Sequence, residues 1–176
     1  MNLVNENDSI LKSHIEPYDF ENPPIIFDGD KEITMDILIG SMFNTLSVNN
    51  AVGLAAPQIG QKLRLFIMDV DNSKFICFNP TILEQSDEEI VGQEGCLSFP
   101  QLTLSVKRPV KIHATYQHID GTPVERNLEG LAARCFCHEL DHLNGITFDT
   151  KVGALSLRMA KQKRKKLFKQ QKRAQK

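Results

Sequence analysis

The 176-residue sequence lacks any long apolar run, whereas a membrane-spanning helix requires about 18 or more consecutive apolar residues. Its first residues, MNLVNENDSI, contain neither the basic segment nor the apolar segment of a secretory signal. No segment repeats along the chain, which argues against repeat architectures. We therefore expect one soluble domain in the cytoplasm, with no membrane partner.

Cysteine is also scarce, with only Cys77, Cys96, Cys135 and Cys137. A chain of this length buries enough apolar surface to fold without disulfides, and a reducing compartment keeps cysteines as thiols. We expect four free thiols, which leaves each of them available as a core residue or as a metal ligand.

Acidic side chains are missing from one end of the sequence. Residues 151–176 carry 11 basic and no acidic side chains, whereas residues 1–150 carry 22 acidic and 10 basic ones. This asymmetry indicates a compact acidic domain followed by a basic arm that can meet an anionic surface.

The apolar pattern predicts both helices and strands. Residues 1–30 are polar and proline-rich and are expected to form an irregular surface segment. Helical spacing appears over residues 33–46 and 129–142, and residues 49–60 look like a loop. The β-rich segments are 64–71, 73–83, 103–107 and 110–117, with a turn at 118–123. We predict an α+β fold in which antiparallel β-sheets pack around the second helix.

The C-terminal stretch contains strong helix formers, with Leu157, Leu167 and Phe168 as its main apolar positions. We expect a basic helix that docks at its start and frays at its end. The predicted organisation is a catalytic domain over residues 1–155 and a basic helix or tail over residues 156–176.

The sharpest chemical motif is His138-Glu139-Leu140-Asp141-His142. Residues four apart lie on one face of a helix, so both imidazoles can reach one ion while Glu139 points beside it. Two histidines leave a catalytic site one protein ligand short, and a cysteine can complete a Cys-His₂ set with water in the fourth position. The motif therefore predicts a hydrolytic metal site.

Cys96 is the best candidate for the third ligand, because the preceding Gly95 permits a close approach of the backbone to the ion. Cys135 and Cys137 lie within one helical turn of the first histidine, where completing a tetrahedron would strain the chain. We expect Cys77 and Cys135 to pack in the core. Cys137 stays open as either a core residue or a ligand.

Three other classes of metal protein compete with this interpretation. A metalloprotease shares the helix but recruits a downstream Glu or His, and after His142 this chain offers Asp149 and no histidine. A structural metal site in a nucleic-acid-binding protein needs four protein ligands and has no use for Glu139. A copper electron-transfer site also uses Cys-His₂, but a Glu between two helical histidines fits hydrolysis better.

Three segments occur in a distinctive order: GLAAPQIG (53–60), EGCLS (94–98) and HELDH (138–142). Together they resemble the signature stretches of the peptide deformylases, and the resemblance is clearest over residues 33–148. It implies a metal-dependent hydrolase that removes the N-formyl group from the initiator methionine of nascent polypeptides and releases formate.

The resemblance also implies a role for each matching residue. Cys96, His138 and His142 match the metal ligands, and Glu139 matches the catalytic acid–base. The implied ion is Fe²⁺ in the cell, with Zn²⁺ or Ni²⁺ as replacements. The remaining matches concern the substrate: the oxyanion donors Gln58 and the backbone amide of Leu97, the peptide-binding backbone at Gly53 and Gly95, and the methionine-pocket residues Leu131 and Cys135.

Two residues depart from the family pattern. Thr103 stands where many members carry Arg or Tyr, and Arg134 stands where bacterial members often carry an aliphatic residue. Residues 1–20 do not match the usual family opening. The basic tail is interpreted either as a contact with ribosomal RNA or as a solvated helix.

Overall fold

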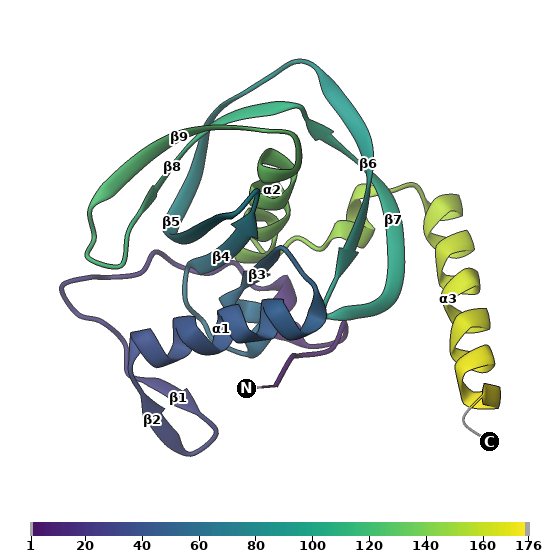
Figure 1. Cartoon of the computed structure of the whole chain (residues 1–176), viewed down its shortest axis with the longest axis horizontal. Coiled ribbons are helices and arrows are strands. Elements are labelled where there is room, and N and C mark those ends of the chain that lie inside the picture. The colour runs from purple at the N-terminus through teal and green to yellow at the C-terminus, as the bar shows by residue number, and fades with distance from the viewer. Residues whose placement is uncertain (1, 175–176) are drawn as a thin grey trace.

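A five-stranded antiparallel sheet curves around one buried helix in this computed structural model, which describes residues 2–174 (Figure 1). The elements in chain order are β1 (Ile26–Asp28), β2 (Lys31–Ile33), α1 (Met35–Asn49), β3 (Gly53–Ala55), β4 (Leu65–Val70), β5 (Ser73–Gln85), β6 (Glu89–Cys96), β7 (Phe99–Pro109), β8 (Lys111–Gln117), β9 (Pro123–Glu129), α2 (Gly130–Leu143) and α3 (Ala154–Ala174). The main sheet has the order β3-β4-β5-β8-β9, and every neighbouring pair is antiparallel. The predicted α+β class is confirmed.

The central helix α2 is buried along most of its length, from Ala133 to Leu143. Its Phe136 meets Phe66 of β4 edge to face, with ring centroids 5.0 Å apart, a favourable geometry for aromatic pairs. The chain leaves the helix at Asn144, so the predicted stop is confirmed. Burial on all sides gives the polar residues of α2 fixed surroundings, and these are the residues of the predicted metal motif.

The other helix in the main body, α1, begins where Thr34 accepts a hydrogen bond from the backbone N–H of Ile37, as N-capping residues do. It packs Leu38, Met42 and Leu46 into a core that it shares with β3 and β4. The segment after it was predicted to be a loop, but Gly53–Ala55 pairs with β4 as the edge strand β3. A 3₁₀ turn follows at Ala56–Ile59.

Strands β6 and β7 form a separate two-stranded sheet, which we call the arm; it arches away from the main sheet (Figure 1). The four strands predicted from the sequence correspond to β4, β5, β7 and β8. Strands β6 and β9 were not predicted. Both are rich in exposed polar residues or glycine, so neither shows the apolar alternation of a half-buried strand.

The N-terminal segment corrects one expectation. Residues 1–30 were predicted to be an irregular surface segment, but Ile10, Leu11 and Ile15 are buried. Ile15 donates its backbone N–H to the carbonyl of Leu143 at 2.9 Å, at the end of α2. Ile10 and Leu11 lie in a four-residue 3₁₀ helix, Ser9–Lys12, and an element this short gives no periodic pattern by which buried residues could be recognised. Met1 lies outside the described residues.

Helix α3 stands at the side of the molecule beside β7 (Figure 1). Leu157 and Ala160 pack against the core cluster that includes Leu104 and Phe148, so the predicted docking of its start is confirmed. Arg164 forms an ion pair with Glu6 of the N-terminal segment. Residues 175–176 of the predicted tail lie outside the described residues. Across residues 2–174, no helix has the length and apolar character to span a membrane.

Candidate metal centre

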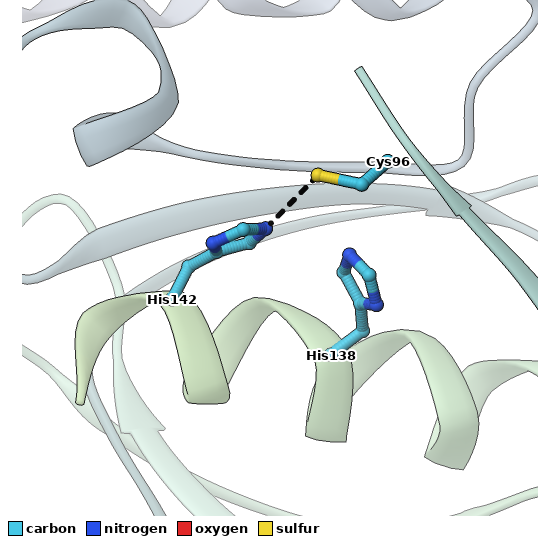
Figure 2. Close-up of side chains that lie close together, drawn as sticks. All are labelled: Cys96, His138 and His142. Carbon is cyan, nitrogen blue, oxygen red and sulfur yellow. Dashed lines mark hydrogen bonds between the residues drawn. The ribbon is translucent and has the colours of Figure 1, made fainter. Parts of the chain in front are cut away.

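Cys96 at the end of β6 meets His138 and His142 of α2, with the thiol facing the two imidazole rings (Figure 2). One ligand atom from each residue can be chosen so that all three lie within 4.8 Å of one another. The Sγ of Cys96 is 3.3 Å from Nε2 of His142. Two such ligands on one tetrahedral ion stand roughly 3.5 Å apart. The three side chains therefore fit a single divalent ion.

The two candidate ligand histidines differ in the surroundings of their other ring nitrogen, Nδ1. Nδ1 of His138 faces Oε2 of Glu94 at 2.9 Å, which leaves Nε2 for an ion. A carboxylate behind a ligand histidine fixes its tautomer and its orientation. Burial lowers the pKa of His142 well below its ordinary value, so this imidazole is neutral, as metal binding requires. Its buried Nδ1 has no hydrogen-bond partner among residues 2–174. Burial also lowers the pKa of His138, but hydrogen bonds to Cys96 and Glu94 outweigh it and raise the value to about 10, so His138 must lose a proton when an ion binds.

Neither Cys137 nor Asp149, the two other residues considered as ligands, lies with the candidate ligand group. Cys137 is buried in the core cluster around α2 and does not belong to the ligand group. Asp149 accepts a hydrogen bond from Thr147 at 2.7 Å and is likewise outside the group. Cys77 is buried in the core as expected. Within residues 2–174, the group thus has three protein ligands, which suits a catalytic site more than a closed structural one.

Behind the histidines lies a buried ionic network centred on Glu94, which the sequence analysis missed. Arg108 of β7 donates Nε to Oε1 of Glu94 at 2.9 Å and Nη2 to Oε2 at 3.0 Å. Its Nη1 donates to Asp141 of α2 at 2.5 Å. Burial raises the pKa of Glu94, but hydrogen bonds from His138 and Arg108 and their charges outweigh it and hold the value at about 2.

The sequence contained little indication of this network. Glu94 stands two residues before Cys96, and Asp141 stands inside the histidine motif. Both were therefore quoted as parts of motifs, but neither was assigned a role. Nothing in the local sequence singles out Arg108, because its partners are 14 and 33 residues away. Only the pairing of β6 with β7 and the packing of the arm on α2 bring them together.

A hydrogen bond from the backbone of a nearby residue orients the Gln58 side chain toward the candidate metal ligands. Its Oε1 accepts the backbone N–H of Ala55 at 2.8 Å, and its Nε2 lies 3.3 Å from the Sγ of Cys96. The side chain is 1% exposed. Leu97 follows the ligand cysteine directly and lines the same cavity. The structure therefore places both predicted oxyanion donors next to the ligand group.

Glu139 is 3% exposed, and its Oε2 has no hydrogen-bond partner among the described residues. Burial raises its pKa to about 7. Gly53 makes room for it: a Cβ at this position would stand 2.9 Å from Cδ of Glu139 and 2.6 Å from Sγ of Cys135. Glycine is thus required where β3 approaches α2.

A cavity of about 600 Å³ opens onto the centre. It lies between the arm and one face of α2, and its lining includes all of the predicted substrate residues, namely Gln58, Leu97, Gly53, Gly95, Leu131 and Cys135. The lining also includes both departures from the family pattern, Thr103 and Arg134. Cys135 thus belongs to the cavity wall as well as to the core.

Three candidate ligands on a buried helix and a strand end, with a carboxylate and a cavity of about 600 Å³ beside them, are the features expected of a metal-dependent hydrolase. Comparison with known proteins gives the family: the model of the family described as "Polypeptide deformylase" matches residues 1–157. The chain belongs to the polypeptide deformylase family. It is an enzyme that hydrolyses the N-formyl group of the initiator methionine on nascent peptides, and its family is metal-dependent.

Individual relatives, both curated sequences and solved structures, are also peptide deformylases. A curated peptide deformylase of Thermotoga petrophila is 45% identical over 124 residues, which cover 70% of this chain and 73% of that protein. A crystal structure of a peptide deformylase from Legionella pneumophila has a TM-score of 0.80 at 32% identity, covering 98% and 97% of the two chains. The Synechococcus elongatus enzyme, solved in complex with actinonin, has a TM-score of 0.80 at 31% identity, covering 93% and 85%.

Replacing Arg108 by Met tests the ionic network. We expect the free energy of unfolding to fall by about 3–5 kcal/mol, because Glu94 and Asp141 would be left as buried charges without their shared cation. The measurement is urea denaturation of the metal-loaded protein, with the exposed Arg126→Met as the matched control. A loss below about 1 kcal/mol, typical of an exposed ion pair, would contradict this account.

Proposed function

We propose that Cys96, His138 and His142 hold one divalent ion and that Glu139 transfers the protons of formyl hydrolysis. The observation that carries this proposal is the convergence of the three ligand atoms beside a buried, unpartnered carboxylate oxygen of Glu139. Cys96, His138 and Glu139 line the cavity that we assign to the substrate.

The proposed reaction consumes one water and one formyl amide. An ion held by Cys96, His138 and His142 would supply Lewis acidity, which would lower the pKa of a water molecule beside it. Glu139 accepts a proton from the attacking water while the oxygen of that water forms a bond to the formyl carbon. Gln58 Nε2 and the backbone N–H of Leu97 donate hydrogen bonds to the oxyanion that forms. The carbon–nitrogen bond then breaks, Glu139 returns the proton to the leaving amine, and the formic acid that is released loses its remaining proton to solvent as formate.

Substrate selection follows from the walls of the cavity. We assign the peptide backbone to Gly53 and Gly95, and the methionine side chain to the surface around Leu131 and Cys135. The formyl carbon carries only hydrogen, so it fits between β3 and α2, where even a methyl group on Gly53 would collide with Cys135. Bulkier acyl groups are therefore excluded by size.

For the ion, we propose Fe²⁺ in the cell, with Zn²⁺ or Ni²⁺ able to replace it. One thiolate and two imidazoles suit borderline divalent metals, and the resemblance to peptide deformylases favours iron among them. Handling in air is expected to select the replacement ions, because thiolate-bound Fe²⁺ is open to oxidation.

Replacing Glu139 by Gln tests the assigned proton transfer. The amide keeps the shape of the side chain but cannot accept a proton, so we expect kcat to fall by about 10²–10⁴-fold. Metal analysis should still find one ion per chain, because the three ligands are intact. Glu32→Gln, an exposed change on β2, is the control; wild-type turnover by the Glu139 variant would refute the role.

We further propose that residues 1–155 form the catalytic domain and that residues 156–176 form a basic helix that contacts ribosomal RNA. The support is the set of 11 basic and no acidic side chains over residues 151–176. Many of these side chains on α3 are exposed, among them Lys165, Lys169 and Lys172. A formylated nascent chain is available at the ribosome, which would place the enzyme in the cytoplasm.

Charge reversal on α3 tests the ribosome contact without removing its docked residues. The triple variant Lys165→Glu, Lys169→Glu, Lys172→Glu should lower ribosome affinity by at least about tenfold and weaken the salt dependence. Sedimentation with purified ribosomes measures this. Lys12→Glu, Lys31→Glu, Lys62→Glu, which reverses three exposed lysines elsewhere, is the matched control. Equal affinity of the two triple variants would favour the solvated helix.

A further inference from the structure

We propose that Arg134 is a positioning residue that clamps the arm onto α2 and so sets the width of the pocket for the substrate's first side chain. The inference rests on the proposed function, since it concerns how the same cavity selects methionine. It gives a role to a residue that the sequence analysis marked only as a departure from the family pattern.

Arg134 occupies the part of α2 that faces the substrate. It follows Leu131 by three residues, so the two lie on one face of the helix, and it is adjacent to Cys135. All three line the cavity. The opposite wall comes from the arm, including Gly95 and Thr103. The separation between the arm and α2 therefore determines how wide a side chain the cavity admits.

The guanidinium of Arg134 is bonded to both strands of the arm. Nη2 donates to the carbonyl of Ile90 on β6 at 2.8 Å, and Nη1 donates to the carbonyl of Val106 on β7 at 2.9 Å. Nη1 also donates to Oε1 of Glu94 at 2.8 Å. The side chain is only 12% exposed. The guanidinium presents donors on separate nitrogens fixed in one plane, which suits acceptors spread over both strands, whereas a lysine ammonium presents its three donors from a single nitrogen.

The arm is shaped to receive this side chain. Gly92 on β6 pairs with Val106 on β7, and a Cβ at Gly92 would stand 2.7 Å from Cζ of Arg134. Glycine is therefore needed for the guanidinium to lie against the strand. The close packing of Arg134 against Gly92, which has no side chain, indicates a specific contact between the arm and α2.

Among residues 2–174, β6 and β7 form a sheet of their own, outside the ladder of the main sheet (Figure 1). The arm is therefore held in place by side-chain contacts: apolar ones through Leu104 and Val106, and polar ones to α2. An isolated two-stranded sheet is marginally stable by itself. Arg108 ties the arm to Asp141 behind the ligand histidines, whereas Arg134 lies in the cavity wall itself. Loss of Arg134 should loosen the pocket wall and leave Glu139 and the ligands in place.

Arg134→Leu tests the clamp through substrate discrimination. We expect the ratio of kcat/KM for formyl-Met-Ala-Ser to kcat/KM for formyl-Phe-Ala-Ser to fall by at least about tenfold, within the range that one pocket wall contributes. The change should appear mainly as a higher KM for the methionine peptide. General destabilisation would lower the rates of both substrates together and leave this ratio unchanged.

Gly92→Ala provides an independent probe, because its methyl group displaces the guanidinium while Arg134 is retained. It should shift the ratio in the same direction, and Arg126→Leu, at an exposed arginine, should not. The Gly92 variant decides the question if Arg134→Leu does not fold. An unchanged ratio in the folded variants would overturn the clamp, whereas a wild-type enzyme that releases no formate from either peptide would overturn the proposed function instead.

Discussion

The buried carboxylate of Glu94 links the three elements around the candidate metal centre, β6, β7 and α2. Glu94 accepts Nε and Nη2 of Arg108 and Nη1 of Arg134, and it faces Nδ1 of His138. These partners come from β7 and α2, while Glu94 belongs to β6. A buried charge is stable only when it is fully paired and hydrogen-bonded, so folding must bring all three elements to this point. The same residue orients a ligand histidine and anchors the strand that carries Cys96.

The remaining features of the site follow from this anchor. With the arm held against α2, the thiol of Cys96 reaches the two imidazoles and the cavity opens between arm and helix. The edge strand β3 closes the other side, where Gly53 leaves room for the Glu139 carboxylate. Burial raises the pKa of that carboxylate to about 7, a value that suits the proton transfer we propose for it near neutral pH.

Much of this arrangement could be predicted from local sequence. The histidine motif needs only helical spacing, and α2 ends at the predicted stop at Asn144, so His138 and His142 were placed correctly on one helix. Gln58 and Leu97 were found through segments that resemble those of the peptide deformylases. The sequence did not predict features that depend on residues far apart in the chain. Arg108 meets Glu94 only through strand pairing. Ile10 and Leu11 are buried by tertiary packing without any periodic pattern. Strand β6 is mostly exposed and glycine-containing, so its sequence did not indicate a strand.

Formate release from formyl-Met-Ala-Ser tests the central claim most directly. The full chain would be loaded with Fe²⁺ under anaerobic conditions and compared with the same preparation after chelation and after Fe²⁺ is returned. The account predicts formate release by the loaded protein, loss of release after chelation, and recovery with the ion. Release that is indifferent to chelation, or none from a folded and metal-loaded chain, would contradict it.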